Sequence, residues 1–314
     1  MDFRSSSKGR RQSWFGLKRH VKRALALPAL AGVLRGIVRI APRLRAGGRL
    51  PAPSNLKEVE GRVGTARFVM VHPDRCEVAK ELYWGKGRLP RASDALALDL
   101  FVATATGADV LLDVGAYTGL FTLAGTTADP RIRAHAFEIV PEVVRTLEEN
   151  CHRNGISDRV EVHAEGVGRD GATMLVPTGI GGSALPSFYS SKLHFDDGVE
   201  VRFRSLDSMV ESFPAASRTV MKIDVEGTED EVFRSGGAFL DTFKPDIVCE
   251  VLHGIAEGEE LDRLLSRFGY AYYLIGSDRL GRSHRIVPNP DFRDWFFTTR
   301  TPDEVRRLGV TIAD

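Results

Sequence analysis

The segment best suited to chemistry is a glycine-containing loop that follows an apolar strand. Residues 109–114, Asp-Val-Leu-Leu-Asp-Val, have the length and composition of a buried strand, and Asp113, Gly115 and Gly119 follow the pattern Asp-x-Gly-x-x-x-Gly. A carboxylate at a strand end, with glycines where the chain turns into a helix, is typical of the first βα unit of a doubly wound sheet. Ligands of such sheets bind outside the carboxyl ends of the strands, so the loop predicts a cofactor site.

The glycine spacing narrows the choice of ligand. Dinucleotide-binding loops usually read Gly-x-Gly-x-x-Gly because a pyrophosphate must contact bare backbone at the helix N-terminus, whereas Tyr117 replaces the middle glycine here. S-adenosylmethionine has no phosphate but carries an ammonium and a sulfonium, which suit the carboxylate of Asp113. We therefore predict an S-adenosylmethionine site that uses Asp113, Gly115, Tyr117 and Gly119, with a plain strand-to-helix turn as the alternative.

Two further acids follow the next two predicted strands. Glu138 ends the second strand, 23 residues after Gly115, where a carboxylate can accept hydrogen bonds from both hydroxyls of a ribose. Dehydrogenases and methyltransferases both place an acid there, so Glu138 predicts an adenosyl ligand without choosing between them. Glu165 follows the third strand, where we expect the adenine edge to lie.

The densest group of polar residues is the run from Val220 to Val232, Val-Met-Lys-Ile-Asp-Val-Glu-Gly-Thr-Glu-Asp-Glu-Val. Asp224 and Glu226 would lie at the carboxyl edge beside the cofactor loop, where like charges need a cation, a metal or a shared proton. Glu250 ends the next strand and His253 follows it, so both are candidates to accept a proton from a substrate hydroxyl. We predict Asp224, Glu226, Glu250 and His253 as catalytic residues, and no metal site, because no metal-ligand spacing is visible.

The rest of the chain alternates between strand and helix patterns, which favours a mainly parallel sheet covered on both faces. This rhythm lapses over residues 171–207, where we predict an inserted hairpin or lid. The predicted strands are 65–71, 134–137, 160–163, 220–225, 247–251, 271–275 and 295–298. The predicted helices are 93–105, 121–128, 141–150, 228–235 and 259–268.

Composition indicates a globular protein with a separate basic arm. Hydrophobic residues make up 43% of the chain and charged residues 27%, enough for a sizeable core. The net charge is only +1, yet residues 1–50 contain 13 of the 43 Lys and Arg and one of the 42 acids. The remainder, with 30 basic and 41 acidic residues, is therefore acidic. Three widely spaced cysteines suggest no disulfide framework and favour a reducing compartment.

Within the arm, residues 14–40 alternate between apolar and basic positions at helical spacing. A basic amphipathic stretch of this kind can lie on an anionic membrane, and a solvated or domain-packing helix is the alternative. The longest uncharged run, residues 24–34, is too short to span a bilayer. Nucleic-acid binding is disfavoured because the acidic remainder would repel phosphate.

The chain resembles the FkbM-type family of S-adenosylmethionine-dependent methyltransferases between about Thr65 and Thr298. The likeness is carried by Leu-Asp-Val-Gly-Ala-Tyr-Thr-Gly from Leu112, Ala-Phe-Glu-x-x-Pro from Ala136, Ser-Leu-Asp-Ser from Ser205, and above all Met-Lys-Ile-Asp-Val-Glu-Gly-Thr-Glu from Met221. The resemblance implies a class I methyltransferase fold with seven strands, the last antiparallel, and O-methylation of a hydroxyl on a sugar, polyketide or related metabolite. The sequence departs from the family in having Tyr117 and Ala164 where Asn is common.

These observations combine into one prediction of fold and function. The expected fold is α/β, a Rossmann-like, doubly wound, mainly parallel seven-stranded sheet with a basic N-terminal helical arm. Residues 1–50 would form the arm, 51–108 a cap segment, 109–300 the methyltransferase domain and 301–314 a C-terminal tail. We expect a cytoplasmic S-adenosylmethionine-dependent O-methyltransferase with a small-molecule or glycan acceptor, no nucleic-acid partner, and peripheral membrane contact through residues 14–40. A nicotinamide-dependent oxidoreductase and a non-catalytic membrane-tethered binding module remain as alternatives.

Overall fold

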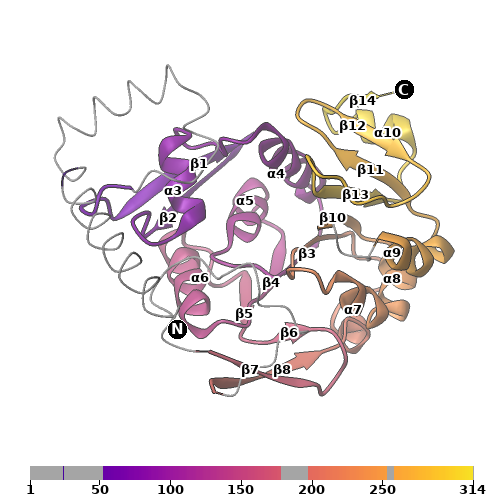
Figure 1. The fold of residues 1–314 in the computed structure, drawn as a ribbon, viewed down its shortest axis with the longest axis horizontal. Coiled ribbons are helices and arrows are strands. Elements are labelled where there is room, and N and C mark those ends of the chain that lie inside the picture. Colours follow the sequence, from indigo (N-terminus) through magenta and orange to yellow (C-terminus); the bar gives the residue numbers. More distant parts are fainter. Residues whose placement is uncertain (1–23, 25–51, 178–196, 253–257, 314) are drawn as a thin grey trace, which may run out of the picture. The chain divides into compact units, whose positions relative to one another are not determined.

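The computed structural model describes residues 24, 52–177, 197–252 and 258–313 (Figure 1). The basic arm, the predicted site residue His253 and much of the predicted insertion therefore lie outside the described residues. The chain divides into two compact units, Met1–Gly61 with Met70–Pro90, and Arg62–Val69 with Arg91–Asp314. Every predicted site residue belongs to the larger unit.

The smaller unit is built around a short helix, α3 (Glu77–Trp84). Its first turn is capped by Cys76, whose Sγ accepts from the Ala79 N–H at 3.4 Å. Tyr83 and Trp84 at its end pack edge to face, with ring centroids 4.9 Å apart, against buried Ala52. The strands β1 (Glu58–Val63) and β2 (Ala66–Val71), which pair in a two-stranded sheet, contribute residues to both units.

A nine-stranded sheet dominates the larger unit, in the order β14-β12-β11-β13-β10-β9-β3-β4-β5. Five neighbouring strands pair in parallel: β5 (Val160–His163), β4 (Arg133–Phe137), β3 (Val110–Val114), β9 (Thr219–Ile223) and β10 (Asp246–Glu250). The strand β13 (Asp294–Thr298) is antiparallel to both β10 and β11 (Ala271–Ile275). The seven strands from β11 to β5 thus form the predicted class I arrangement, and β12 (Leu280–Ser283) and β14 (Ile312–Ala313) extend its edge.

Helices lie against both faces of this sheet. Neighbouring residues of a strand point to opposite faces, and Leu111 and Leu112 show what covers each. Leu111 lies beside Gly125 of α5 (Leu120–Ala128), where an added Cβ would be 2.4 Å from its Cδ1. Leu112 joins a buried cluster on the other face. This face is covered by α7 (Glu229–Arg234), α8 (Gly237–Phe243), α9 (Gly258–Leu265) and the 3-10 turns at Asp207–Ser212 and Ser266–Phe268.

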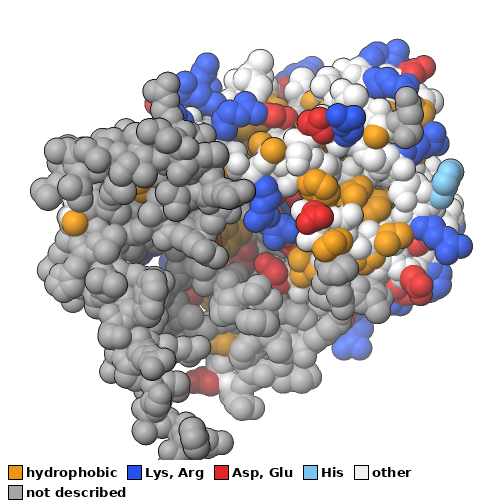
Figure 2. All heavy atoms as spheres, turned by 45° about the horizontal axis from the view of Figure 1, so that its top comes forward, with side chains coloured by type: hydrophobic (Ala, Val, Ile, Leu, Met, Phe, Trp, Pro, Cys, Tyr) orange, Lys and Arg blue, Asp and Glu red, His pale blue; other side chains and the backbone are white. Residues whose placement is uncertain are grey.

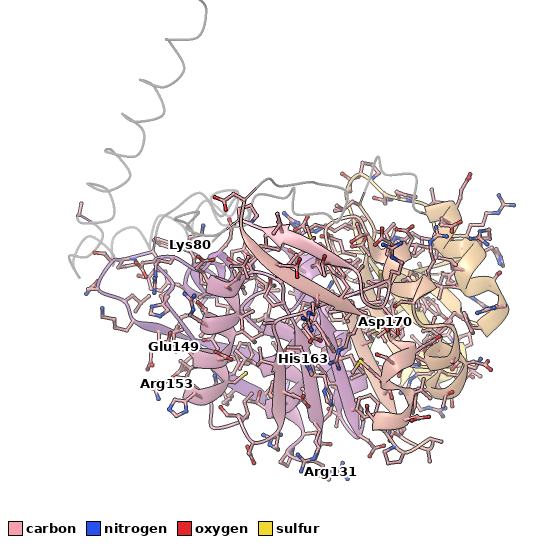
Figure 3. The ribbon with its side chains drawn as sticks, turned by 90° about the horizontal axis from the view of Figure 1, so that it is seen from below. Lys80, Arg131, Glu149, Arg153, His163 and Asp170 are labelled. Carbon is pink, nitrogen blue, oxygen red and sulfur yellow. The ribbon has the colours of Figure 1, made fainter. Side chains whose placement is uncertain are left out.

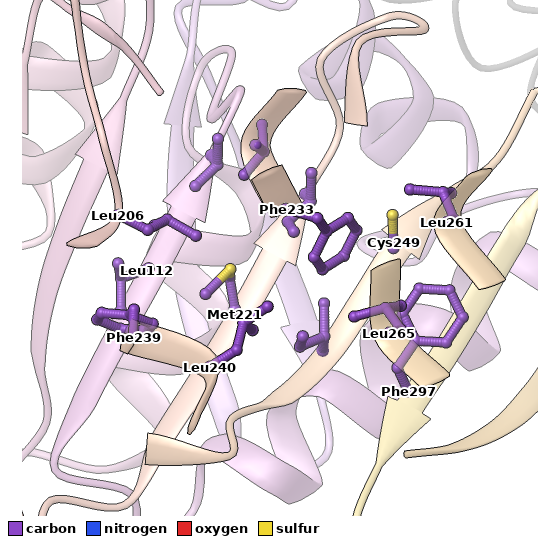
Figure 4. Close-up of a cluster of buried hydrophobic side chains, with 14 of the residues drawn as sticks. Leu112, Leu206, Met221, Phe233, Phe239, Leu240, Cys249, Leu261, Leu265 and Phe297 are labelled. Carbon is purple, nitrogen blue, oxygen red and sulfur yellow. The ribbon is translucent and has the colours of Figure 1, made fainter. Parts of the chain in front are cut away.

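The core of the larger unit is centred on strands β3, β9, β10 and β13. Figure 4 shows Leu112, Met221, Cys249 and Phe297 of these strands facing Phe233, Phe239 and Leu240 of the helices. All five residues of β9 and of β13 are buried, as expected for strands covered on both faces. The three cysteines are buried and free.

The predicted insertion contains a hairpin. Strands β7 (Thr173–Val176) and β8 (Val199–Arg204) pair antiparallel, and β6 (Gly166–Val167) pairs with β8 in parallel to complete a three-stranded sheet. Two further helices flank the sheet. α4 (Ala92–Ala105) corresponds to the predicted helix 93–105, and α6 (Pro141–Arg153) extends three residues beyond the predicted helix 141–150.

The predicted C-terminal tail, residues 301–314, contains a short helix and a strand. Thr301 and Glu304 form a capping box at the start of α10 (Pro302–Arg306), and β14 pairs with β12 in the main sheet. No helix built from the described residues is both long enough and apolar enough to cross a lipid bilayer.

Candidate active site

A cavity of about 160 Å³ lies at the carboxyl ends of β3, β4 and β9. The structure brings together on its wall six of the ten residues predicted from the sequence: Gly115, Tyr117, Glu138, Glu165, Asp224 and Glu226. Because β9, β3 and β4 are neighbours in the sheet, the loops that follow them converge on one point. This is the position at which doubly wound sheets bind their ligands.

The loop after β3 folds tightly because several of its residues adopt the left-handed conformation. Gly115, Tyr117 and Gly119 have φ values of 78°, 49° and 87°. A Cβ on Gly115 would also lie 1.8 Å from the carbonyl oxygen of Asp224. Gly115 is therefore required both by its backbone conformation and by the close approach of the loop after β9.

Glu138 ties this loop to the end of β4. Its Oε2 accepts from the Tyr117 N–H and its Oε1 from the Val140 N–H, both at 2.9 Å. Burial raises the pKa of Glu138 to about 7, although the backbone donors partly oppose the shift. Glu138 lies on the cavity wall, and each carboxylate oxygen has a second lone pair with which to accept from a ligand hydroxyl.

Asp113, predicted as a cofactor ligand, is not on the cavity wall. Its Oδ2 accepts from the Thr122 N–H at 2.9 Å and from the Thr122 hydroxyl at 2.6 Å, inside the first turn of α5. Burial raises the pKa of Asp113 to about 6. The carboxylate therefore anchors the helix that follows the loop. Gly119 likewise lies beneath the loop, facing Leu147 of α6.

The loop after β9 brings together a dense group of charges. Lys222 is buried, and its Nζ lies 3.3 Å from Asp224 Oδ2 and 3.5 Å from Asp294 Oδ1. Burial alone would lower the pKa of Lys222, but the carboxylates of Asp224, Asp294 and Glu250 outweigh it and raise that pKa. One oxygen each from Asp224, Glu226 and Glu250 lies within 4.8 Å of the others.

Glu226 and Glu250 occupy different positions in this group. Glu226 lines the cavity from a left-handed backbone conformation with φ of 56°, and burial and the nearby Asp224 raise its pKa. Glu250 is buried, its Oε1 pairs with Arg293 Nη1 at 2.9 Å, and its Oε2 has no hydrogen-bond partner among the described residues. Burial raises the pKa of Glu250 well above its ordinary value.

Several residues at the site were missed by sequence reasoning. Arg293 and Asp294 lie 43 and 44 positions beyond Glu250 and reach it only because β13 pairs with β10. Met174 and Phe203 of the inserted hairpin supply apolar wall, and Phe203 packs directly over Gly166. The apolar alternation of the hairpin indicated a strand, but nothing in it indicated contact with the cavity. The predicted site residue Glu165 pairs with Arg204 Nε at 2.7 Å.

Comparison with known proteins agrees with this arrangement. Residues 113–272, half of the chain, match the family model for the methyltransferase FkbM domain. Among the curated proteins, none matches this sequence.

Several similar solved structures share little sequence identity with this chain. They include an S-adenosylmethionine-dependent O-methyltransferase from Thermotoga maritima, with 11% identity, a TM-score of 0.37, and 75% of this chain and 74% of that chain covered. An O-methyltransferase from Bacillus cereus in complex with S-adenosylhomocysteine has 14% identity, a TM-score of 0.34, and coverage of 64% and 78%. A precorrin-6y C5,15-methyltransferase from Geobacter metallireducens has 10% identity, a TM-score of 0.36, and coverage of 64% and 85%.

The match to the family model and the strand order of the main sheet both oppose the nicotinamide-dependent alternative. The chain belongs to the FkbM methyltransferase family and is an S-adenosylmethionine-dependent methyltransferase.

Proposed function

We propose that this protein transfers a methyl group from S-adenosylmethionine to a hydroxyl of a small molecule or glycan, such as a sugar, a polyketide or a related metabolite. The observation that supports this proposal is the convergence of Asp224 and Glu226 on the same cavity as the β3 loop and Glu138. An oxygen nucleophile must lose a proton on methylation, and carboxylates beside the cavity can accept it.

The described residues fit the cofactor in charge and polarity. Asp224 offers negative charge to an ammonium and Glu226 to a sulfonium. Glu138 offers acceptor lone pairs to a ribose, and Met174 and Phe203 offer apolar surface to a flat base. The cavity of about 160 Å³ is smaller than the roughly 300–1,000 Å³ of most small-molecule sites. We therefore expect Met174 and Phe203 to shift when the cofactor binds.

We assign the general base to Glu226. When bound, S-adenosylmethionine supplies an electrophilic methyl group on a positively charged sulfur. Glu226 would accept the hydroxyl proton as the acceptor oxygen forms its bond to the methyl carbon, while the electron pair of the broken carbon–sulfur bond stays on sulfur. A raised pKa suits this role, because the base works best near the ambient pH.

The neighbouring residues would position Glu226 and the acceptor. Lys222 fixes Asp224 through its ion pair, and the left-handed backbone at Glu226 aims that carboxylate at the cavity. A strained conformation of a residue other than glycine costs on the order of 1–3 kcal/mol and is concentrated at functional sites. Positioning of this kind can supply about 7–11 kcal/mol of the barrier reduction.

The test uses the full chain, a metabolite extract and S-adenosylmethionine with an isotopically labelled methyl group. Mass spectrometry should detect a labelled product, with the label on oxygen. Glu226→Gln should lower the transfer rate by about 10²- to 10⁴-fold. It should leave the affinity for S-adenosylhomocysteine nearly unchanged, because that product carries no charge on sulfur. Glu138→Gln should instead weaken S-adenosylhomocysteine binding, measured by titration calorimetry.

The matched control is Glu231→Gln, which alters a carboxylate on α7 that is not on the cavity wall. Glu231→Gln should change neither the transfer rate nor the affinity for S-adenosylhomocysteine. Label found on nitrogen or carbon would contradict O-methylation, and a Glu226→Gln rate equal to the wild-type rate would remove Glu226 as the base. Binding of S-adenosylhomocysteine without transfer to any acceptor would favour the non-catalytic alternative.

A further inference from the structure

A second cluster of polar side chains lies on strands β4 and β5, away from the cavity wall described above. His135 is opposite Glu161 in the parallel register of these strands, and Phe137 is opposite His163. Positions 135, 161 and 163 therefore point to one face of the sheet. Figure 3 labels His163 among the strands of the sheet.

The three side chains meet in a compact triangle. His135 Nδ1 lies 3.1 Å from His163 Nε2. Glu161 reaches both rings, with Oε2 3.5 Å from His135 Nδ1 and Oε1 3.8 Å from His163 Nε2. One ligand atom from each residue lies within 4.8 Å of the other two.

The two imidazoles are held in place by aromatic packing. The His163 ring stacks on Phe137 with centroids 4.4 Å apart, and the His135 ring meets the edge of Phe213 at 5.1 Å. Burial lowers the pKa of both histidines. Only the Glu161 carboxylate, with 66% of its side chain exposed, can rotate freely.

These distances resemble those between the ligands of a bound transition metal. Zinc bonds histidine nitrogen at about 2.0–2.1 Å and carboxylate oxygen at about 2.0–2.2 Å, so a tetrahedral arrangement separates its ligand atoms by roughly 3.3–3.5 Å. The observed separations of 3.1, 3.5 and 3.8 Å lie close to these values. Rotation of Glu161 would adjust the longest of them.

We propose that His135, Glu161 and His163 form a binding site for a first-row transition metal ion, with zinc as the best-suited species. Two imidazoles and one carboxylate disfavour magnesium and calcium, which prefer oxygen ligands. Three protein ligands leave one coordination position open. A cavity of about 710 Å³ adjoins the site, and it is lined by all three ligands and by Arg131, Arg133 and Arg204. An anion or a water molecule from this cavity would complete the coordination.

A hydrogen-bonded histidine pair is the competing explanation for the triangle. It accounts for the 3.1 Å contact between the rings, since one tautomer can donate and the other accept. It does not account for Glu161, whose oxygens, at 3.5 and 3.8 Å, bridge the same two nitrogens. A cation among the three groups accounts for all of the contacts together.

The position of the site gives metal binding a structural consequence. The carbonyl of His163 accepts from the Glu138 N–H at 3.1 Å, and Glu165 follows His163 by two residues. A metal bound between β4 and β5 would fix the edge strand to its neighbour directly below two residues of the cofactor cavity. The metal proposal does not depend on which acceptor the enzyme methylates.

The test is zinc binding by the metal-free full chain, measured by competition with a chromophoric chelator and repeated with Co²⁺ to record its ligand-field spectrum. We expect one tight equivalent per chain. Glu161→Gln should weaken this equivalent by more than about tenfold, since changes to outer-shell partners alone cost about 10- to 100-fold. His135→Phe and His163→Phe keep an aromatic ring for packing and should abolish the tight equivalent and the tetrahedral Co²⁺ spectrum.

The matched control is His284→Gln, an exposed histidine outside the cluster, which should bind zinc as the wild type does. Glu161 is exposed, so its replacement should leave the fold intact, and circular dichroism of the metal-free variants checks this. Zinc should raise the melting temperature of the wild type more than that of Glu161→Gln, because only a ligand of the folded state stabilises it. Equal zinc affinity of the wild type and Glu161→Gln, or the absence of any tight equivalent, would overturn the proposal.

Discussion

Gly115 lies where the loop after β3 closely approaches the loop after β9. It follows β3, has φ of 78°, and its Cα faces the carbonyl of Asp224 in the loop after β9. A side chain at this position would separate the loop that carries Tyr117 from the loop that carries Glu226. The spacing of the two loops, and hence the width of the cofactor cavity, depends on the absence of a side chain at position 115.

We expect Gly115→Ala to lower the free energy of unfolding by at least about 3 kcal/mol, the upper range for single substitutions. Gly155→Ala is a matched control, because Gly155 also has a positive φ, of 65°, but an added Cβ there meets nothing within 4 Å. Gly155→Ala should lower the free energy of unfolding by about 1–2 kcal/mol, the cost of the left-handed conformation alone. Urea unfolding measures both variants. Equal losses would show that the contact with Asp224 is readily relieved.

Asp113 and Glu138 show how far a single residue can be predicted from sequence. Both were predicted as cofactor ligands from their positions at strand ends, but only Glu138 lies on the cavity wall. Asp113 instead pairs with Thr122, nine residues later, at the first turn of α5. A carboxylate at a strand end can point outward to a ligand or back to the helix N-terminus, and sequence position alone does not distinguish the two.

The pairing of β10 with β13 is the element-level contact that completes the charged group. It brings Asp294 opposite Glu250, and at the other end of the strands Asp246 receives three hydrogen bonds. Thr298 Oγ1 donates to Asp246 Oδ1 at 2.5 Å, and Arg300 Nε and Nη2 donate to Oδ2 at 2.8 and 2.7 Å. Asp246 therefore fixes the register of the antiparallel strand.

We expect Asp246→Ala to cost about 2–4 kcal/mol of unfolding free energy, because it leaves Arg300 and the buried Thr298 hydroxyl without their acceptor. Asp241→Ala is the matched control. Asp241 also pairs with a basic residue, Lys244, at 2.9 Å, but the Asp241 side chain is 75% exposed. Asp241→Ala should therefore cause no measurable change in the free energy of unfolding. Thermal and urea unfolding should both show that Asp246→Ala is less stable than Asp241→Ala. A cost for Asp246→Ala no larger than that for Asp241→Ala would contradict the proposed role.

Strands and helices with clear periodicity were predictable, and short elements were not. β11 occupies the predicted residues 271–275, and β4, β5, α4 and α5 differ from prediction by one residue at most. The helix α8 was missed because it has seven residues and starts at a Gly-Gly pair, which local preference disfavours. It forms because Phe239, Leu240 and Phe243 are buried in the core, which no local pattern reveals.

The turn before α7 shows that local sequence also failed to predict individual hydrogen bonds. The spacing of Thr228 and Glu231 predicts a capping box, yet the Thr228 hydroxyl donates to the Val225 carbonyl at 3.2 Å. Glu229 occupies the turn instead, and its Oε1 accepts from the backbone of Val225 and Gly227. The local pattern located the turn correctly, but it did not identify Glu229 as the side chain that accepts the hydrogen bonds of the turn.

At the scale of the whole molecule, the described surface differs sharply from the basic arm. On the face that Figure 2 presents, acidic and basic side chains are interspersed over the coloured part. Among the described residues, only Val199 and Val287 are large apolar side chains that are exposed. Large exposed apolar side chains are therefore few among the described residues. We expect any membrane affinity of the chain to come from residues 14–40, where the sequence combines basic and apolar residues.

We expect the full chain to float with vesicles of phosphatidylserine and phosphatidylcholine, and not with phosphatidylcholine alone. Replacing Lys18, Arg19, Lys22 and Arg23 by Gln should weaken binding by about 4 kcal/mol, roughly a thousandfold, since each basic residue near an anionic surface contributes about 1 kcal/mol. The matched control changes four exposed arginines elsewhere to Gln: Arg67, Arg145, Arg282 and Arg307. It removes the same net charge from the molecule, so it separates a local effect of the arm from the effect of overall charge. Equal flotation of the two variants would show that the arm does not direct the protein to membranes.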